Sequence, residues 1–162
     1  MRTNERGTSF MDLTKHAPRS VYDTLGGMRF LPRAIDKMRA EIAGTSGEYN
    51  ARTGFGTRLF DLLGVDADGF EAIVRAHDTD EGVLQGLLAH KHPSVEAVAA
   101  FNHQAESWPE GNPEAQERHR TMLEKAGFGH RTDIVTMADR LDLDDGREVP
   151  HGGHLGKGLA KH

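Results

Sequence analysis

The sequence contains no cysteine among its 162 residues. This absence excludes disulfide bonds, thiolate metal sites, iron–sulfur clusters held by cysteine and a cysteine nucleophile. Long apolar runs are missing too, because no stretch approaches the roughly 18 consecutive apolar residues of a membrane-spanning helix. A chain of this length can bury roughly 70% of the surface that its unfolded form exposes. We therefore expect a soluble domain whose core forms without covalent cross-links.

Positive charge is also scarce. The chain has 20 basic against 25 acidic residues, which gives a formal net charge of −5. Nucleic-acid binders usually present a basic field to the phosphate backbone, so no nucleic-acid partner is expected. The first ten residues, MRTNERGTSF, lack the apolar segment of a secretion signal. The sequence therefore predicts a cytoplasmic protein with neither a nucleic-acid nor a membrane partner.

The usual nucleotide-binding motifs are absent as well. The segment around Gly156 is not a phosphate-binding loop, because a glycine stands where a Ser or Thr must follow Lys157. The segment 54–59 begins with Gly-Phe-Gly but lacks the third glycine of a dinucleotide fingerprint. ATP or a redox cofactor is therefore not expected, and the sequence points to no other cofactor.

The chain is instead rich in amphipathic helical patterns. The clearest runs over about 32–43, with apolar residues at helical spacing and Pro32 in its first turn. The strongest helix start is Asn112-Pro113-Glu114, where a capping side chain precedes proline and an acid. Other helices are expected over about 57–63, after Asp66 or Asp68, after Thr79, over about 95–107, and after Thr132 with an end near Gly146.

These patterns predict an all-α fold, a single compact domain of about seven helices. Strand signals are nearly absent, although Gly26-Gly27 marks a turn. Residues 1–20 are expected to form an N-terminal arm, residues 21–150 the helical domain, and residues 151–162 a Gly/His-rich tail. Both tails are polar or glycine-rich and are expected to be flexible.

The polar face of the 32–43 helix is one candidate site. Arg33 and Lys37 lie four residues apart and so share a face, with Asp36 beside them. Arg33 can grip a carboxylate or phosphate in a fork, with Asp36 as a second substrate-binding residue, and a buried Lys37 can act as base or nucleophile. The alternative is an ordinary solvated charged face.

A long glycine-rich loop, residues 44–56, follows that helix. Within it, Glu48 and Tyr49 place a carboxylate beside a phenol, a pair that could transfer protons once it is desolvated. Loops on a rigid scaffold often carry function. The alternative is a loop that is simply anchored by packing of Tyr49.

Histidines are the third group of interest, because imidazole is a common metal ligand and titrates near neutral pH. His119 lies on the apolar stripe of its helix and is either a base or ligand facing a cavity or a core histidine satisfied by one hydrogen bond. His90, His92 and His103 form a looser set, with surface histidines as the alternative. No metal site is assigned to them.

Two segments resemble a family of small bacterial proteins, the domain of unknown function 5069 family. They are LGGMRFLPRAIDKMRAEIAGTSGEY, from Leu25 to Tyr49, and RTDIVTMADRLDLDDGREVP, from Arg131 to Pro150. The resemblance covers about residues 11–150 and implies a helical, cytoplasmic bacterial protein. It implies no activity, substrate or cofactor. It does give weight to the charged cluster, because the shared motif falls on Arg33, Asp36, Lys37, Glu48 and Tyr49.

Three functions remain open. The first is a small enzyme (a lyase, isomerase or hydrolase) in which Arg33 and Asp36 bind an anionic small molecule and Lys37, Glu48 or Tyr49 moves protons. The second is a non-catalytic helical module that dimerises or docks a partner, with Tyr49 and Trp108 as anchors. The third is a histidine-ligated metalloprotein. A homodimer is a reasonable expectation in any case, since it is the commonest small oligomer.

Overall fold

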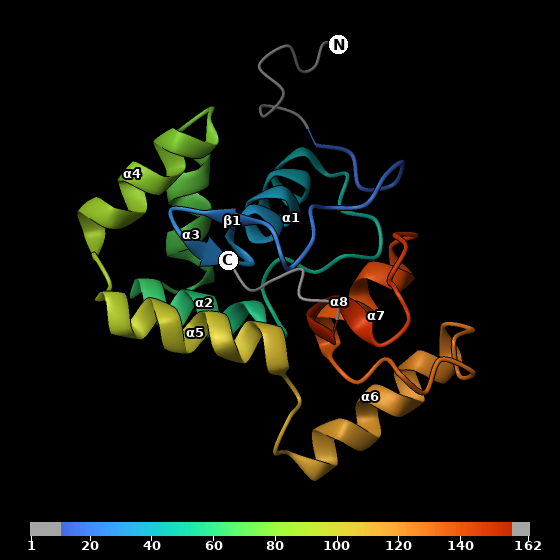
Figure 1. Cartoon of the computed structure of the whole chain (residues 1–162). Coiled ribbons are helices and arrows are strands. Elements are labelled where there is room, and N and C mark those ends of the chain that lie inside the picture. Colours follow the sequence, from blue (N-terminus) through green and yellow to red (C-terminus); the bar gives the residue numbers. More distant parts are fainter. Residues whose placement is uncertain (1–10, 157–162) are drawn as a thin grey trace.

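The computed structural model describes residues 11–156, which form a helical domain with one short hairpin (Figure 1). This confirms the predicted all-α class. The first ten residues of the predicted arm and residues 157–162 of the predicted tail lie outside the described residues. The helices within 11–156 are α1 (Leu31–Ala43), α2 (Gly56–Leu63), α3 (Ala67–Arg75), α4 (Asp80–His90), α5 (Val95–Ser107), α6 (Pro113–Lys125), α7 (Met137–Asp144) and the single turn α8 (Gly153–Gly156).

Capping side chains fix where most of these helices begin. The side chains of Asp66, Thr79, Ser94 and Asn112 each accept a hydrogen bond from the amide three residues later, at the starts of α3, α4, α5 and α6. Such bonds satisfy amides that the first helical turn leaves free. The predicted starts of these four helices are confirmed.

The predicted start of the last helix is wrong. Helix α7 is capped by Thr136, whose hydroxyl accepts from the amide of Asp139, and not by Thr132. The amide of Met137 donates to the carbonyl of Trp108 over 2.8 Å, which ties the start of α7 to the end of α5. Ile134 is buried in the preceding segment rather than on the helix. The helix therefore starts at a local capping residue four positions after the predicted one, and a tertiary contact supports this boundary.

A small hairpin precedes α1. Strand β1 (Thr24–Leu25) pairs antiparallel with β2 (Met28–Arg29), with Thr24 opposite Arg29. Gly26 and Gly27 form the turn with φ angles of 60° and 79°, a conformation that favours glycine. The sequence signalled the turn but not the paired residues on either side of it.

Helix α1 runs through the centre of the molecule (Figure 1). It contacts α3 and the hairpin, and its apolar stripe of Leu31, Ile35 and Met38 is fully buried. The opposite face is buried as well: Arg33 and Asp36 are each 2% exposed. The charged face of α1 is therefore not the solvated surface that one reading of the sequence allowed.

Part of the predicted N-terminal arm packs onto the domain. In residues 11–20, Leu13, Pro18 and Ser20 are buried. Arg19 bridges two helices, because its guanidinium pairs with Asp36 of α1 at 2.9 Å and with Asp80 of α4 at 2.8 Å. The packed domain therefore begins before residue 20.

Helices α6, α7 and α8 lie on the side of the molecule away from α3 and α4 (Figure 1). A small apolar cluster of Leu123, Ile134, Leu143 and Val149 holds α6 and α7 to the segments beside them. In α8, Nε2 of His154 lies 3.4 Å from Oδ2 of Asp142, and its ring packs edge-on against the ring of Tyr22. No helix in the described part of the chain is both long and apolar enough to cross a lipid bilayer.

Candidate functional site

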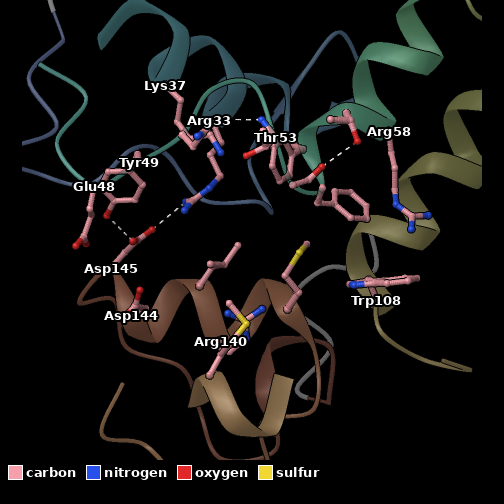
Figure 2. A pocket seen from close by; sticks show the side chains of 18 of the residues that line it. Arg33, Lys37, Glu48, Tyr49, Thr53, Arg58, Trp108, Arg140, Asp144 and Asp145 are labelled. Carbon is pink, nitrogen blue, oxygen red and sulfur yellow. Dashed lines mark hydrogen bonds and ion pairs between the residues drawn. The ribbon is translucent and has the colours of Figure 1, made fainter. Parts of the chain in front are cut away.

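A cavity of about 790 Å³ opens between the two sides of the molecule (Figure 2). Its walls come from α1, the 48–55 loop, the first turn of α2, the end of α5, and helices α6 and α7. Figure 2 shows Arg33 and Lys37 on one side and Arg140 with Asp144 on the other. The glycine-rich loop after α1 is therefore part of the cavity wall.

Lys37 extends from α1 into this cavity wall. Its Nζ lies 5.5 Å from the centre of the Phe30 ring, a cation–π distance. Burial lowers the pKa of Lys37 to about 8, helped by the nearby positive charge of Arg33 and opposed by the negative charge of Asp145. Within the described residues, no ion pair joins Lys37 to a carboxylate. A sizeable fraction of this amine is therefore neutral near physiological pH.

Arg33 forms a buried ion pair across the cavity floor. Its Nη1 donates to Asp145 over 2.9 Å, and these side chains are 3% and 1% exposed. The same Nη1 donates to the carbonyl of Arg19 over 3.0 Å, while its Nε is buried without a hydrogen-bond partner among the described residues. One terminal nitrogen of the Arg33 guanidinium is therefore already bonded to groups of the protein itself.

Tyr49 is held by the same carboxylate. Its hydroxyl donates to Asp145 over 2.7 Å, and its ring lies 5.8 Å from the Arg33 guanidinium carbon. Burial, together with this hydrogen bond, raises the pKa of Tyr49. The phenol consequently stays protonated at neutral pH and is a proton donor rather than a base. Glu48 is exposed and lines the cavity next to it (Figure 2).

The structure thus brings together Arg33, Lys37, Glu48 and Tyr49 but not the fifth predicted site residue. Asp36 lies on the same helix and points to another contact, where it accepts three hydrogen bonds from Arg19. Arg19 in turn pairs with Asp80, which also accepts from Arg39 over 2.9 Å. This partly buried network joins α1 to α4 and lies outside the cavity lining.

Two arginines that the sequence did not single out complete the cavity. Arg58, in the first turn of α2, lies 4.4 Å over the ring of Trp108 and 5.5 Å from that of Phe55. Arg140, on α7, donates from Nε to His119 Nδ1 over 3.0 Å. Neither arginine forms an ion pair within the described residues. Both guanidiniums therefore lack a salt bridge in this part of the chain, although the negative charge of Asp144 acts on Arg140.

The cavity carries an excess of positive charge. Five basic residues face three acidic ones, and Asp145 is already neutralised by two arginines, Arg33 and Arg147, at 2.9 and 3.1 Å. Trp108 and Phe55 add a flat apolar wall beside Arg58. The basic lining residues are Arg33, Lys37, Arg58, Arg118 and Arg140, and the acidic ones are Glu48, Asp144 and Asp145. Such a lining suits an anionic ligand with an apolar part.

A family model described as Domain of unknown function (DUF5069) matches residues 15–147. The chain belongs to the DUF5069 family. The match confirms the resemblance seen in the two sequence segments, and it spans the entire cavity, since the lining residues run from Phe30 to Asp145. No match is found among curated proteins.

The histidines that the sequence singled out in this DUF5069 chain contact different groups. His90 Nε2 lies 2.9 Å from the carbonyl of Gly64, and His92 Nδ1 lies 3.3 Å from that of Pro93. His103 is exposed on α5. Within residues 11–156, no three histidine or acidic side chains are grouped as metal ligands. The metalloprotein hypothesis stays a prediction, without a preformed ligand set in this part of the chain.

His119 is a buried histidine with a defined role in the packing. It is 6% exposed, and its Nε2 donates to the carbonyl of Ile134 over 2.9 Å. Its Nδ1 must then be the acceptor for Arg140, which requires a neutral ring. Burial lowers the pKa of His119, and the charges of Arg140 and Arg120 act in the same direction. This core histidine is thus satisfied by two hydrogen bonds, one of which reaches a cavity residue.

Proposed function

We propose that this DUF5069 protein is a small cytoplasmic enzyme that acts on an anionic small molecule in the cavity. In this proposal Arg58 and Arg140 hold the anion, Lys37 transfers the proton, and Tyr49 and Glu48 assist at the loop side. The observation that carries it is the convergence of Lys37 with two arginines that form no ion pair among the described residues, all in one concave site.

The unbalanced charge supports the anionic ligand. Gathering like charges in a partly buried site raises the free energy of the folded chain, so such an arrangement is usually kept for a ligand of opposite charge.

The state of Lys37 supports proton transfer. A general base works best when its pKa lies near the working pH. The pKa of Lys37 is lowered to about 8 by burial, whereas an exposed lysine amine is almost fully protonated at that pH. Lyases, isomerases and hydrolases all use such a base, so the proposal covers these three reaction classes.

The competing proposal is a non-catalytic docking or dimerisation module. It would place Arg33, Asp36 and Lys37 in ion pairs between subunits. The contacts inside the chain favour the enzyme, because Arg33 already pairs with Asp145 and Asp36 already pairs with Arg19. What remains is a concave site rather than a flat charged face.

The only tryptophan gives a direct test, because Trp108 lines the cavity and stacks on Arg58. Titration with inorganic phosphate, and then with a series of small carboxylates and phosphate esters, is expected to change Trp108 fluorescence in a saturable way. The change should weaken at least about tenfold in Lys37→Met and in Arg140→Met, because each removes one charge from the cavity. Lys125→Met is the matched control and should respond like the wild type, since Lys125 is exposed at the end of α6.

Circular dichroism and urea unfolding establish that each variant is folded. A fluorescence response that is equal in all three variants would contradict the proposal, as would the lack of a saturable response to every anion in the series. Concentration-dependent dimerisation that is lost in Lys37→Met would favour the docking module instead.

A further inference from the structure

We infer that Lys37 is an amine nucleophile, and that the substrate is a carbonyl compound (an aldehyde or ketone) that also carries a phosphate or carboxylate. The reaction would proceed through an imine on Nζ. This inference rests on the proposed function and narrows it, because it gives Lys37 a covalent role and gives the ligand a second functional group.

The setting of Lys37 favours a nucleophile over an anion-binding group. The amine sits against the face of Phe30 on a largely buried part of α1. Two guanidiniums without an ion pair among the described residues line other parts of the cavity, Arg58 beside Trp108 and Arg140 on α7 (Figure 2). The cavity therefore separates an amine from its anion-binding arginines, as a two-ended ligand requires.

The charge state of the amine agrees with this geometry. Only the neutral amine has the lone pair that attacks a carbonyl carbon, and desolvation of a lysine is one established route to that form. Burial is the largest cause of the lowered pKa of Lys37, followed by the charge of Arg33. At a pH near 8, about half of this amine is in the reactive form.

The covalent step balances without a further reactant. The Nζ lone pair forms the new C–N bond, and the carbonyl π electrons move to oxygen. The oxygen takes up a proton and the positively charged nitrogen loses one, which gives a neutral carbinolamine. The hydroxyl group then leaves as water with a second proton as the C=N bond forms. Starting from neutral amine and carbonyl, one proton is taken from solvent in total, and the products are a protonated imine and water.

Pyridoxal 5′-phosphate is a suitable probe, because it joins an aldehyde to a phosphate in one flat molecule. The full-length protein is incubated with it near pH 8, reduced with sodium borohydride, digested, and mapped by mass spectrometry over its six lysines. Lys37 is expected to be modified at least about tenfold faster than exposed Lys125, because its neutral fraction is larger. Equal rates at the two lysines would overturn the inference.

A matched pair of probes and variants sharpens the result. Pyridoxal has the same aldehyde without the phosphate, so the preference for Lys37 over Lys125 should fall at least about tenfold when it replaces the phosphate ester. Lys37→Arg keeps the charge but cannot form the imine, and it should lose this adduct while Lys125→Arg keeps it. If pyridoxal shows no preference among the lysines but Lys37→Arg still forms the adduct with pyridoxal 5′-phosphate, the adduct lies at another lysine. That result would contradict the inference.

Failure of the inference and failure of the proposed function are distinguishable. Inorganic phosphate has no carbonyl group, so its effect on Trp108 fluorescence tests anion binding alone. Saturable phosphate binding with no preferred adduct at Lys37 would overturn the imine and leave the anion site standing. No binding and no preferred adduct would overturn both.

Discussion

Arg140 donates from its Nε to Nδ1 of His119 over 3.0 Å, and the same imidazole donates from Nε2 to the carbonyl of Ile134 over 2.9 Å. The carbonyl can only accept, so the Nε2–H tautomer of a neutral ring is the form that makes both bonds. His119 thus links the loop before α7 to a guanidinium in the cavity wall. His119 does not line the cavity, but it orients Arg140, which does.

The first prediction concerns pH. The pKa of His119 is lowered in the folded chain, mainly by burial. As pH falls below about 6.5, the unfolded chain binds a proton that the folded chain does not yet take up, so the free energy of unfolding decreases; above that pH both states are neutral and the effect vanishes. Urea unfolding between about pH 5 and 7.5 should show a flatter pH dependence for His119→Gln than for the wild type.

His103→Gln is the control for this experiment, because His103 is exposed on α5. It should keep the wild-type pH dependence. Identical slopes for His119→Gln and the wild type would show that protonation of this ring is not coupled to folding.

The second prediction is that Lys37→Met raises stability at neutral pH. The pKa of Lys37 is about 8 in the folded chain and ordinary in the unfolded chain, so between about pH 10.4 and 8 the unfolded state binds a proton first. Below pH 8 the folded state therefore carries a constant penalty, which methionine removes. The gain in the free energy of unfolding should be about 2 kcal/mol larger near pH 7 than near pH 9.5.

Urea unfolding at these two pH values measures the difference, with Lys125→Met as the matched control. A stabilising substitution that also weakens anion binding is the pattern expected of a residue kept for function. A loss of stability in Lys37→Met near pH 7 would show that its amine makes a favourable contact instead.

The third prediction concerns the buried pair of Arg33 and Asp145. Asp145→Asn leaves the charge of Arg33 buried without its partner and should lower the free energy of unfolding by about 3–5 kcal/mol. Glu117→Gln is the control, because it removes an ion pair between two exposed side chains, Arg120 (61% exposed) and Glu117 (69%). This substitution should change the free energy of unfolding little. A double-mutant cycle with Arg33→Met should show positive coupling, and independent effects of the two substitutions would refute the pairing.

The fourth prediction tests how tightly the hairpin packs against α4. A Cβ at Gly26 would lie 2.7 Å from Leu84 Cδ1, whereas one at Gly27 would meet nothing within 4 Å. Both glycines have positive φ, so each Gly→Ala change costs roughly 1–2 kcal/mol from backbone strain. Gly26→Ala should cost about 1–3 kcal/mol more, because Leu84 must move. Urea midpoints compare the two, and equal losses would mean that the hairpin packs loosely on α4.

The helices could be predicted because their signals are local. Ser94, Asn112 and Thr79 each mark a start through a bond three residues away, and Gly44 and Gly64 end helices with positive φ. The start of α7 was missed because Thr132 and Thr136 are both capping side chains by type, and the Met137–Trp108 contact that accompanies the cap at Thr136 joins residues far apart in sequence. The two-residue strands beside Gly26-Gly27 were missed because so short a pattern carries no periodicity.

The site residues likewise divide into those that local sequence patterns could bring together and those that they could not. Arg33, Lys37 and Tyr49 come from one continuous stretch, so spacing on α1 and the following loop could bring them together. Arg58 and Arg140 come from α2 and α7, and no local pattern separates a cavity arginine from a surface one. Asp36 shares the face of Arg33 and Lys37 in sequence, but its partner Arg19 lies 17 residues away and holds it in another contact.

The most direct measurement is the pKa of Lys37 itself, followed by NMR of lysines labelled with ¹³C at Cε. Six lysines give a spectrum in which Lys37→Arg identifies the signal by its loss. That signal should titrate near pH 8 and shift to higher pH when inorganic phosphate is added at constant ionic strength, because a bound anion stabilises the ammonium. A signal that titrates with the exposed lysines and does not respond to phosphate would contradict both the reactive amine and the anion-binding cavity.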